Sequence, residues 1–113
     1  MKIAISIISD PKAGEEALAR VFNALSLAAE SRAAGDQVEV SFIGTGTRWP
    51  AELAKLGHPA NELYNEVREV IVGASCACAA VFGATESLAA CGVPERKEGL
   101  HRPLAEGWQV LVF

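Results

Sequence analysis

The run "KIAISIIS" over residues 2–9 is the feature that most constrains the fold of this chain. It is rich in β-branched side chains and shows no alternation between apolar and polar positions. A strand with one face in water alternates, whereas a strand covered on both faces is apolar throughout. The run therefore predicts a doubly covered strand of a parallel sheet. Asp10, Pro11 and Gly14 predict the loop that follows it.

An amphipathic helix is predicted over residues 15–34. Glu15 and Glu16 suit the positive end of a helix dipole, and Gly35 is a typical residue just beyond a helix C-terminus. Apolar side chains recur at helical spacing through this segment: Leu18, Val21, Phe22, Leu25, Ala28 and Ala29. These positions form the stripe that we expect to pack into the core.

The rest of the chain repeats this alternation of strands and helices. Strands are predicted over residues 37–43, 70–72 and 109–113, and helices are predicted over residues 51–56, 60–69 and 76–91. Loops are expected over residues 44–50 and 95–107, and the second loop has room for one helical turn. This order predicts one α/β domain over residues 1–113. The expected fold is a doubly wound parallel sheet of four to five strands with helices on both faces, of the Rossmann or flavodoxin type.

Composition and charge exclude several classes of protein. Half of the 113 residues are hydrophobic, which predicts a packed core, and the net charge of −4 without a basic run gives no electrostatic basis for binding nucleic acid. The apolar stretches are far shorter than a membrane span, so no membrane partner is predicted. The N-terminal "MKIAISIISD" has no long apolar region of a signal peptide, which predicts a cytoplasmic protein. Thiols stay reduced there, so the three cysteines do not predict a disulfide.

The site is expected at the carboxyl ends of the strands, where doubly wound sheets bind their ligands. Three segments follow predicted strands and carry the candidate residues Asp10, Arg48, Trp49, Ser75, Cys76 and Cys78. Arg48 and Trp49 are candidates for binding an anion or a partner, and packing against a neighbouring subunit is an equal alternative for Trp49. Asp10 has either a substrate role or a capping role on the first helix.

The segment "GASCACAAVFGA" over residues 73–84 has the chemistry of a reactive thiol site. Ser75 is predicted to cap the helix that follows, its hydroxyl accepting a hydrogen bond from the amide of Cys78. Cys76 and Cys78 then lie in the first turn, where free amides and the helix dipole stabilise a thiolate. The neighbouring residues are small and leave room for a substrate.

Core packing is the alternative for the cysteines, because cysteine is one of the most buried residue types. If the helix is continuous to Cys91, one stripe of it contains Cys78, Val81, Ala84, Leu88 and Cys91. We expect Cys91 to pack in the core, and we leave both readings open for Cys76 and Cys78. Their C-x-C spacing does not favour a relaxed disulfide within a helical turn.

Other motifs predict no cofactor and no metal. Gly44-Thr45-Gly46 follows a strand, but Trp49 stands where a dinucleotide fingerprint needs its third glycine, so a tight turn is expected. The residues Cys76, Cys78, Cys91 and His101 lack the spacing of zinc ligands. A catalytic pair of Cys78 and His101 stays open, because spacing alone does not place the imidazole.

Four segments together resemble the DsrE/DsrF-like family of small sulfur-relay proteins: "KIAISIISDP", "VSFIGTG", "GASCACAAVFGA" and "EGWQVLVF". The resemblance covers nearly the whole chain and implies a homo-oligomer, a trimer or hexamer. In active members, a cysteine in the third segment carries sulfane sulfur as a persulfide, and Cys78 matches it because "CAAVFGA" follows. Members of the family have a cysteine at the position of Ser75. This chain departs from that pattern and has Cys76 instead.

The expected function is therefore that of an intracellular sulfur carrier or sulfurtransferase subunit that exchanges sulfur with donor and acceptor proteins. Cys78 is the expected nucleophile, Cys76 its assistant, and Arg48 a source of positive charge. The alternative is a non-catalytic oligomeric subunit that binds a small anionic ligand or a partner protein at the same crevice. In that case the cysteines are inert, and thiol reactivity separates the two functions.

Overall fold

The strand β1 (Lys2–Ile7) lies inside the sheet and is buried on both faces, as its composition predicts. Every residue from Ile3 to Ile7 is buried, including Ser6. In the computed structural model, which describes residues 1–113, β2 (Gln37–Phe42) and β5 (Gln109–Val112) flank this strand, both in parallel. The strand ends two residues earlier than expected, and Ile8 is 47% exposed.

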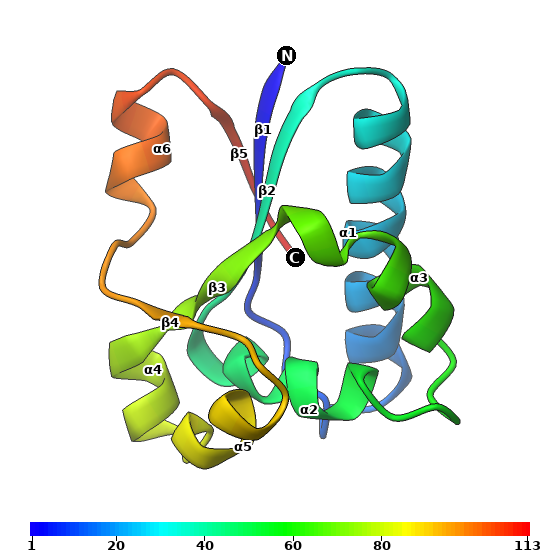
Figure 1. Ribbon diagram of the computed structural model, residues 1–113. Coiled ribbons are helices and arrows are strands. Elements are labelled where there is room, and N and C mark those ends of the chain that lie inside the picture. The colour runs from blue at the N-terminus through cyan, green and yellow to red at the C-terminus, as the bar shows by residue number, and fades with distance from the viewer.

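The sheet has five parallel strands in the order β4-β3-β2-β1-β5, which confirms a doubly wound α/β fold. β3 (Ile71–Ser75) and β4 (Glu95–Arg96) extend it beyond β2. The chain steps from β1 to β4 in one direction and then crosses back to place β5 on the other side of β1. Right-handed crossovers in opposite directions place helices on opposite faces of a sheet. α1 (Glu15–Ala33) and α3 (Asn61–Glu66) accordingly lie on one side and α6 (His101–Ala105) on the other (Figure 1).

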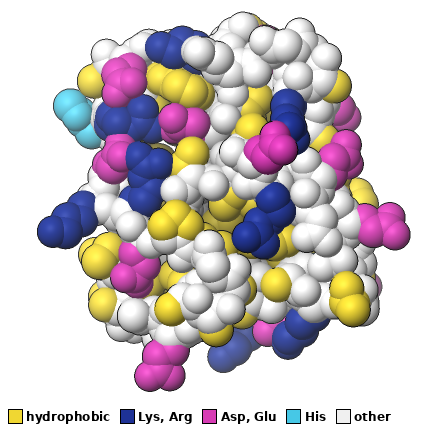
Figure 2. All heavy atoms as spheres, viewed as in Figure 1, with side chains coloured by type: hydrophobic (Ala, Val, Ile, Leu, Met, Phe, Trp, Pro, Cys, Tyr) yellow, Lys and Arg dark blue, Asp and Glu magenta, His cyan; other side chains and the backbone are white.

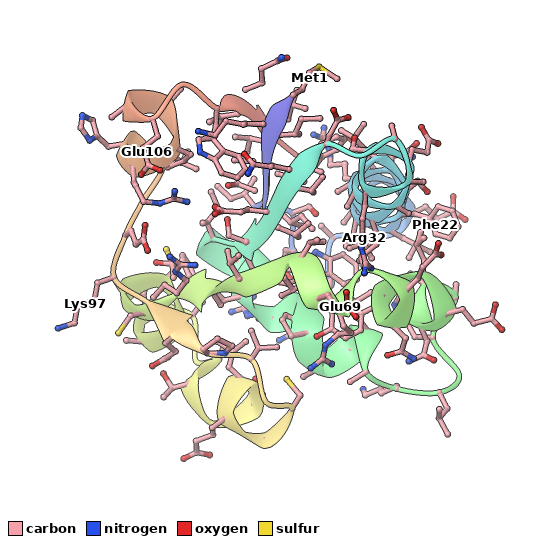
Figure 3. All side chains as sticks on the ribbon, turned by 45° about the horizontal axis from the view of Figure 1, so that its top comes forward. Met1, Phe22, Arg32, Glu69, Lys97 and Glu106 are labelled. Carbon is pink, nitrogen blue, oxygen red and sulfur yellow. The ribbon has the colours of Figure 1, made fainter.

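The main core lies between the sheet and α1. It combines alternate side chains of β1 and β2 with the inner side of α1: Ile3, Ile5, Ile7, Val38, Val40, Phe42, Val21, Leu25 and Ala28. Phe22 was expected in the same stripe, but it points away from the sheet and is 43% exposed (Figure 3). Figure 3 also shows Arg32 of α1 and Glu69 directed toward each other, and the two side chains form an ion pair.

Two expected loops contain regular structure. Residues 44–50 form a 3₁₀ helix, η1 (Gly44–Arg48), which leads directly into α2 (Trp49–Leu53), so the helix predicted at 51–56 begins two residues earlier. Residues 95–107 contain β4 and α6. Both elements are very short, and neither leaves a clear periodic pattern in the sequence.

The helix expected over residues 76–91 is two helices, α4 (Cys76–Val81) and α5 (Thr85–Ala90). Gly83 adopts a left-handed conformation, with φ of 70°, and the amide of Ala84 donates to the carbonyl of Ala79 at 2.8 Å. These features form a glycine C-cap that ends α4. The chain turns at this point, so Val81 is 74% exposed and not part of a core stripe.

Smaller differences concern the segment before β3. The helix predicted over residues 60–69 divides into α3 and the short 3₁₀ helix η2 (Arg68–Val70), and β3 runs on to Ser75. The predicted end of α1 at Gly35 is confirmed, since Gly35 has a φ of 86° and Asp36 donates to the carbonyl of Ser31 at 3.0 Å. None of the helices has the length and apolar character needed to cross a membrane.

Candidate functional site

The structure brings Asp10, Arg48 and Trp49 together at the carboxyl ends of β1 and β2. The guanidinium of Arg48 forms an ion pair with Asp10, with Nη1 2.9 Å from Oδ2. The indole Nε1 of Trp49 donates to the hydroxyl of Ser9 at 3.2 Å. Both interactions join the loop after β1 to the segment after β2, as expected for loops that leave the same edge of a parallel sheet.

Arg48 also connects these loops to the segment after β3. Its Nε donates to the carbonyl oxygen of Phe82 at 3.2 Å, and its guanidinium lies 5.8 Å from the centre of the Phe82 ring. Phe82 follows α4 and precedes the turn at Gly83. One side chain therefore fixes the positions of three segments that are far apart in the sequence.

The three segments enclose an open groove of about 720 Å³, a size typical of small-molecule sites. Its lining includes Arg48 and Trp49, and it also includes residues that the sequence did not indicate as site residues: Lys12, Glu15, Leu18, Glu52, His58 and Phe82. No local motif marks these side chains. Their common location depends on how the loops pack, which composition and spacing do not reveal.

Asp10 does not cap α1, so the capping alternative for this residue is wrong. The N-cap position is Gly14, and no side chain caps the helix. Asp10 instead accepts the amide of Lys12 at 2.9 Å through one carboxylate oxygen and Arg48 through the other. The first contact forms a local Asx turn, and the second joins Asp10 to Arg48, which lines the groove.

Trp49 is only 2% exposed, so the chain itself buries almost the whole indole. His58 packs against it edge to face, with ring centres 6.0 Å apart. Little indole surface is left for the subunit contact that the sequence left open. Trp49 is a structural part of the groove and holds its wall against the loop after β1.

The cysteine segment adopts the predicted local structure. Ser75 is the N-cap of α4, and its hydroxyl accepts the amide of Cys78 at 3.2 Å. Cys76 and Cys78 lie in the first turn as free, partly exposed thiols. This turn contains no acidic residue, so no carboxylate of its own opposes a thiolate.

The predicted site residues nevertheless belong to two places. Cys76 and Cys78 do not line the groove that contains Arg48 and Trp49. Ser75 lines a separate cavity on the opposite side of the sheet. Cys76 and Cys78 are therefore partly exposed residues at the start of α4, and they do not form one pocket with Arg48 and Trp49.

The remaining cysteine and the histidines form no catalytic or metal site with them. Cys91 packs against the core, and its Sγ donates to the carbonyl of Leu88 at 3.6 Å, which confirms the structural role expected for it. No hydrogen bond joins a cysteine to a histidine, and no three Cys, His, Asp or Glu side chains converge as metal ligands.

A small cavity of about 40 Å³ lies between the sheet and α6. Its walls are polar: the hydroxyls of Ser6 and Ser41 are 3.0 Å apart, and Arg102 pairs with Glu39, Glu98 and Glu106. Figure 2 shows basic and acidic side chains gathered over this part of the molecule, near α6 and β4. The ion pair of Arg102 with Glu39 joins α6 to β2, so this cluster fastens α6 to the sheet.

Comparison with known proteins supports the fold alone. No family model and no curated protein sequence matches the chain. A solved structure of a conserved protein of unknown function from Bacteroides thetaiotaomicron is similar, with a TM-score of 0.67 and 19% sequence identity over 97% of this chain and 94% of that one. The similarity covers nearly the whole chain, and at this identity it concerns architecture rather than activity.

Proposed function

We propose that this protein is a sulfur-carrier subunit of the sulfurtransferase type, in which Cys78 holds sulfane sulfur as a persulfide. The observation that supports the proposal most directly is the Ser75 cap on the amide of Cys78. It holds two partly exposed thiols in one helical turn at the carboxyl edge of the sheet. The resemblance of this segment to the DsrE/DsrF-like family points to the same residue.

The location of the thiols suits exchange with another protein. A carrier receives sulfur from one protein and passes it to another, so its thiol has to be reachable at the surface rather than enclosed in a pocket. All three cysteines are partly exposed, but Cys91 packs against the core and its Sγ donates to the carbonyl of Leu88, whereas Cys76 and Cys78 lie at the start of α4. A homo-oligomer, which the family resemblance implies, and a cytoplasmic location, which the sequence predicts, remain parts of this proposal.

The proposed exchange needs no oxidant and no cofactor. The thiolate of Cys78 attacks the outer sulfur of a donor persulfide, forms a new S–S bond and releases the donor thiolate. An acceptor thiolate then attacks the outer sulfur of the Cys78 persulfide, and the Cys78 thiolate leaves. Cys76, two residues away, is positioned to assist, and Arg48 belongs to the groove and takes no part.

An intact-mass measurement tests the proposal. Reduced protein is incubated with a low-molecular-weight persulfide, next to the variants Cys76→Ala and Cys78→Ala. Cys76→Ala is the matched control, because its thiol has the same class of exposure and lies in the same turn. We expect a gain of one sulfur atom in the wild-type and Cys76→Ala proteins and none in Cys78→Ala.

The same experiment can favour the second candidate, a non-catalytic binding subunit. No gain of sulfur in any variant, together with slow alkylation of all three thiols in the folded protein, would show that the cysteines are structural. The groove of about 720 Å³ is the observation that favours this candidate, because it is present whether or not the thiols react.

A further inference from the structure

The groove between the loops after β1, β2 and α4 contains more free hydrogen-bond donors than the fold uses. Arg48 has five N–H groups. Its Nε donates to Phe82 and its Nη1 to Asp10, and Nη2 has no partner in the chain. The guanidinium is thus fixed in position while part of its donor capacity is left for another molecule.

Two further donors face the same groove. The ammonium of Lys12 forms no ion pair and no side-chain hydrogen bond. The Nδ1 atom of His58 accepts the amide of Ala60 at 3.1 Å. A neutral imidazole whose Nδ1 is an acceptor carries its proton on Nε2, so His58 presents one more N–H without a partner.

The acidic side chains at the groove, unlike these donors, mostly have a partner within the chain. Glu52 of the lining is paired with Lys55 at 2.9 Å, and Asp10, which is outside the lining, is paired with Arg48 at 2.9 Å. Glu15 is the one carboxylate of the lining without an ion pair, and it is located in the uncapped first turn of α1, where helix amides compensate its charge. The unsatisfied groups of the groove are therefore mainly donors.

The groove also has apolar walls next to these donors. Pro11, Leu18 and Phe82 line it, and the buried Trp49 supports one side. Small-molecule sites combine apolar walls with a few polar groups that orient the ligand. A free inorganic ion would use the donors and leave the apolar walls without a contact.

We propose that this groove binds a small organic anion, with a carboxylate or phosphate group held by Arg48, Lys12 and His58 and an apolar body, such as a ring, against Leu18 and Phe82. A planar guanidinium held at Nε and Nη1 presents its free edge for recognition of such a group. The inference is independent of the proposed sulfur chemistry, since neither Cys76 nor Cys78 lines the groove.

Titration of the isotope-labelled protein, followed by nuclear magnetic resonance, tests the inference. The probes are phenyl phosphate, phenylacetate and inorganic phosphate. Comparing the first two shows whether the groove prefers a phosphate or a carboxylate, and comparing phenyl phosphate with inorganic phosphate shows what the ring contributes. We expect saturable shifts of the Arg48 Nε–H, the Trp49 indole N–H and the Phe82 amide with at least one aromatic acid, with a Kd of about 1 mM. Inorganic phosphate should bind more weakly than phenyl phosphate.

Charge-removing variants identify the binding groups. Lys12→Gln should raise the Kd about threefold, and Arg48→Gln combined with Asp10→Asn should raise it about tenfold or more. The double change avoids an unpaired Asp10, whose charge would itself repel the probe. Lys12→Gln keeps the test valid if the double variant does not fold, because Lys12 has no side-chain partner to lose.

Arg20→Gln is the matched control, because Arg20 lies on α1 outside the groove and pairs only with Glu16. Its Kd should equal that of the wild-type protein. The proposal is overturned if none of the three probes gives saturable shifts at the groove. It is also overturned if Lys12→Gln, like Arg20→Gln, leaves the Kd unchanged.

Discussion

Gly46 packs so closely against the end of β1 that a methyl group at this position should destabilise the protein strongly. A Cβ atom built on Gly46 lies 2.0 Å from the carbonyl oxygen of Ile7, 2.8 Å from its carbon and 3.2 Å from the Cα of Ile8. All three atoms belong to the backbone of one chain segment, so no side chain can rotate away. Real Cβ atoms keep at least 3.0 Å, and η1 must therefore move outward by 1.0 Å, the difference between 3.0 and 2.0 Å.

The cost follows from the contacts that this movement disturbs. The amide of Ile43 donates to the carbonyl of Ile7 at 2.9 Å, and the amide of Gly46 donates to the carbonyl of Ile43 at 2.9 Å. Each such bond contributes about 1 kcal/mol, and overpacking of a tight interior costs about 1–3 kcal/mol. The fully packed Trp49 follows three residues later and would shift as well. We expect Gly46→Ala to lower the free energy of unfolding by about 3 kcal/mol or more.

Urea denaturation measures the effect, with Gly57→Ala as the matched control. No atom lies within 4 Å of a Cβ built on Gly57, and its φ is not in the left-handed region. The control should change the free energy of unfolding by less than about 1 kcal/mol, in the stabilising direction if at all. A loss below about 1 kcal/mol in Gly46→Ala would refute the reasoning. It would mean that η1 can separate from β1 at little cost and that the groove wall is not rigid.

Two further predictions concern Ser75 and Tyr64. Ser75→Ala should lower the free energy of unfolding, measured in urea, by about 1 kcal/mol. Ser75→Asp keeps an acceptor for the Cys78 amide and should not lower it. If both variants lose the same free energy of unfolding, the cap is not the cause. Tyr64 is fully buried and its hydroxyl has no partner, so Tyr64→Phe should raise the free energy of unfolding by about 1 kcal/mol at neutral pH. Burial raises the pKa of Tyr64 above its ordinary value of 10.0, against the opposing effect of Arg68. The unfolded chain then loses this proton first, so the contribution of Tyr64 to stability should be fully present below about pH 10 and be lost as the pH rises further, by up to about 1.4 kcal/mol per pH unit. Denaturation at a series of pH values should show this fall in the wild-type protein and a smaller one in Tyr64→Phe, and identical slopes would contradict the assignment to Tyr64.

The sequence predicted the elements whose signals are local and long. The apolar run at residues 2–9 became β1, and the periodic stripe at residues 15–34 became α1, which ends at the predicted glycine. The Ser75 cap was also predictable, because a cap depends only on residues three apart along one chain segment. These features need no knowledge of the rest of the fold.

The short elements β4 and α6 were not predictable from the sequence, for a physical reason. β4 has two residues and α6 has five, too few for a hydrophobic period to develop. The sequence predicts a continuous helix through Gly83, since an isolated glycine is tolerated inside helices. In the folded chain it adopts a positive φ and ends α4, which exposes Val81 and changes the course of the segment.

Local sequence was enough to predict a parallel α/β fold and two cysteines in the first turn of a capped helix, because strand burial and helix capping depend on residues close together in the chain. Tertiary structure alone decided which loops touch. Arg48 meets Asp10 and Phe82 across separations of 38 and 34 residues, and His58 joins them from a fourth segment. Contacts between distant segments depend on strand order and loop packing, which no local pattern encodes. For that reason the thiols and the groove, expected as one site, occupy separate places in the folded protein.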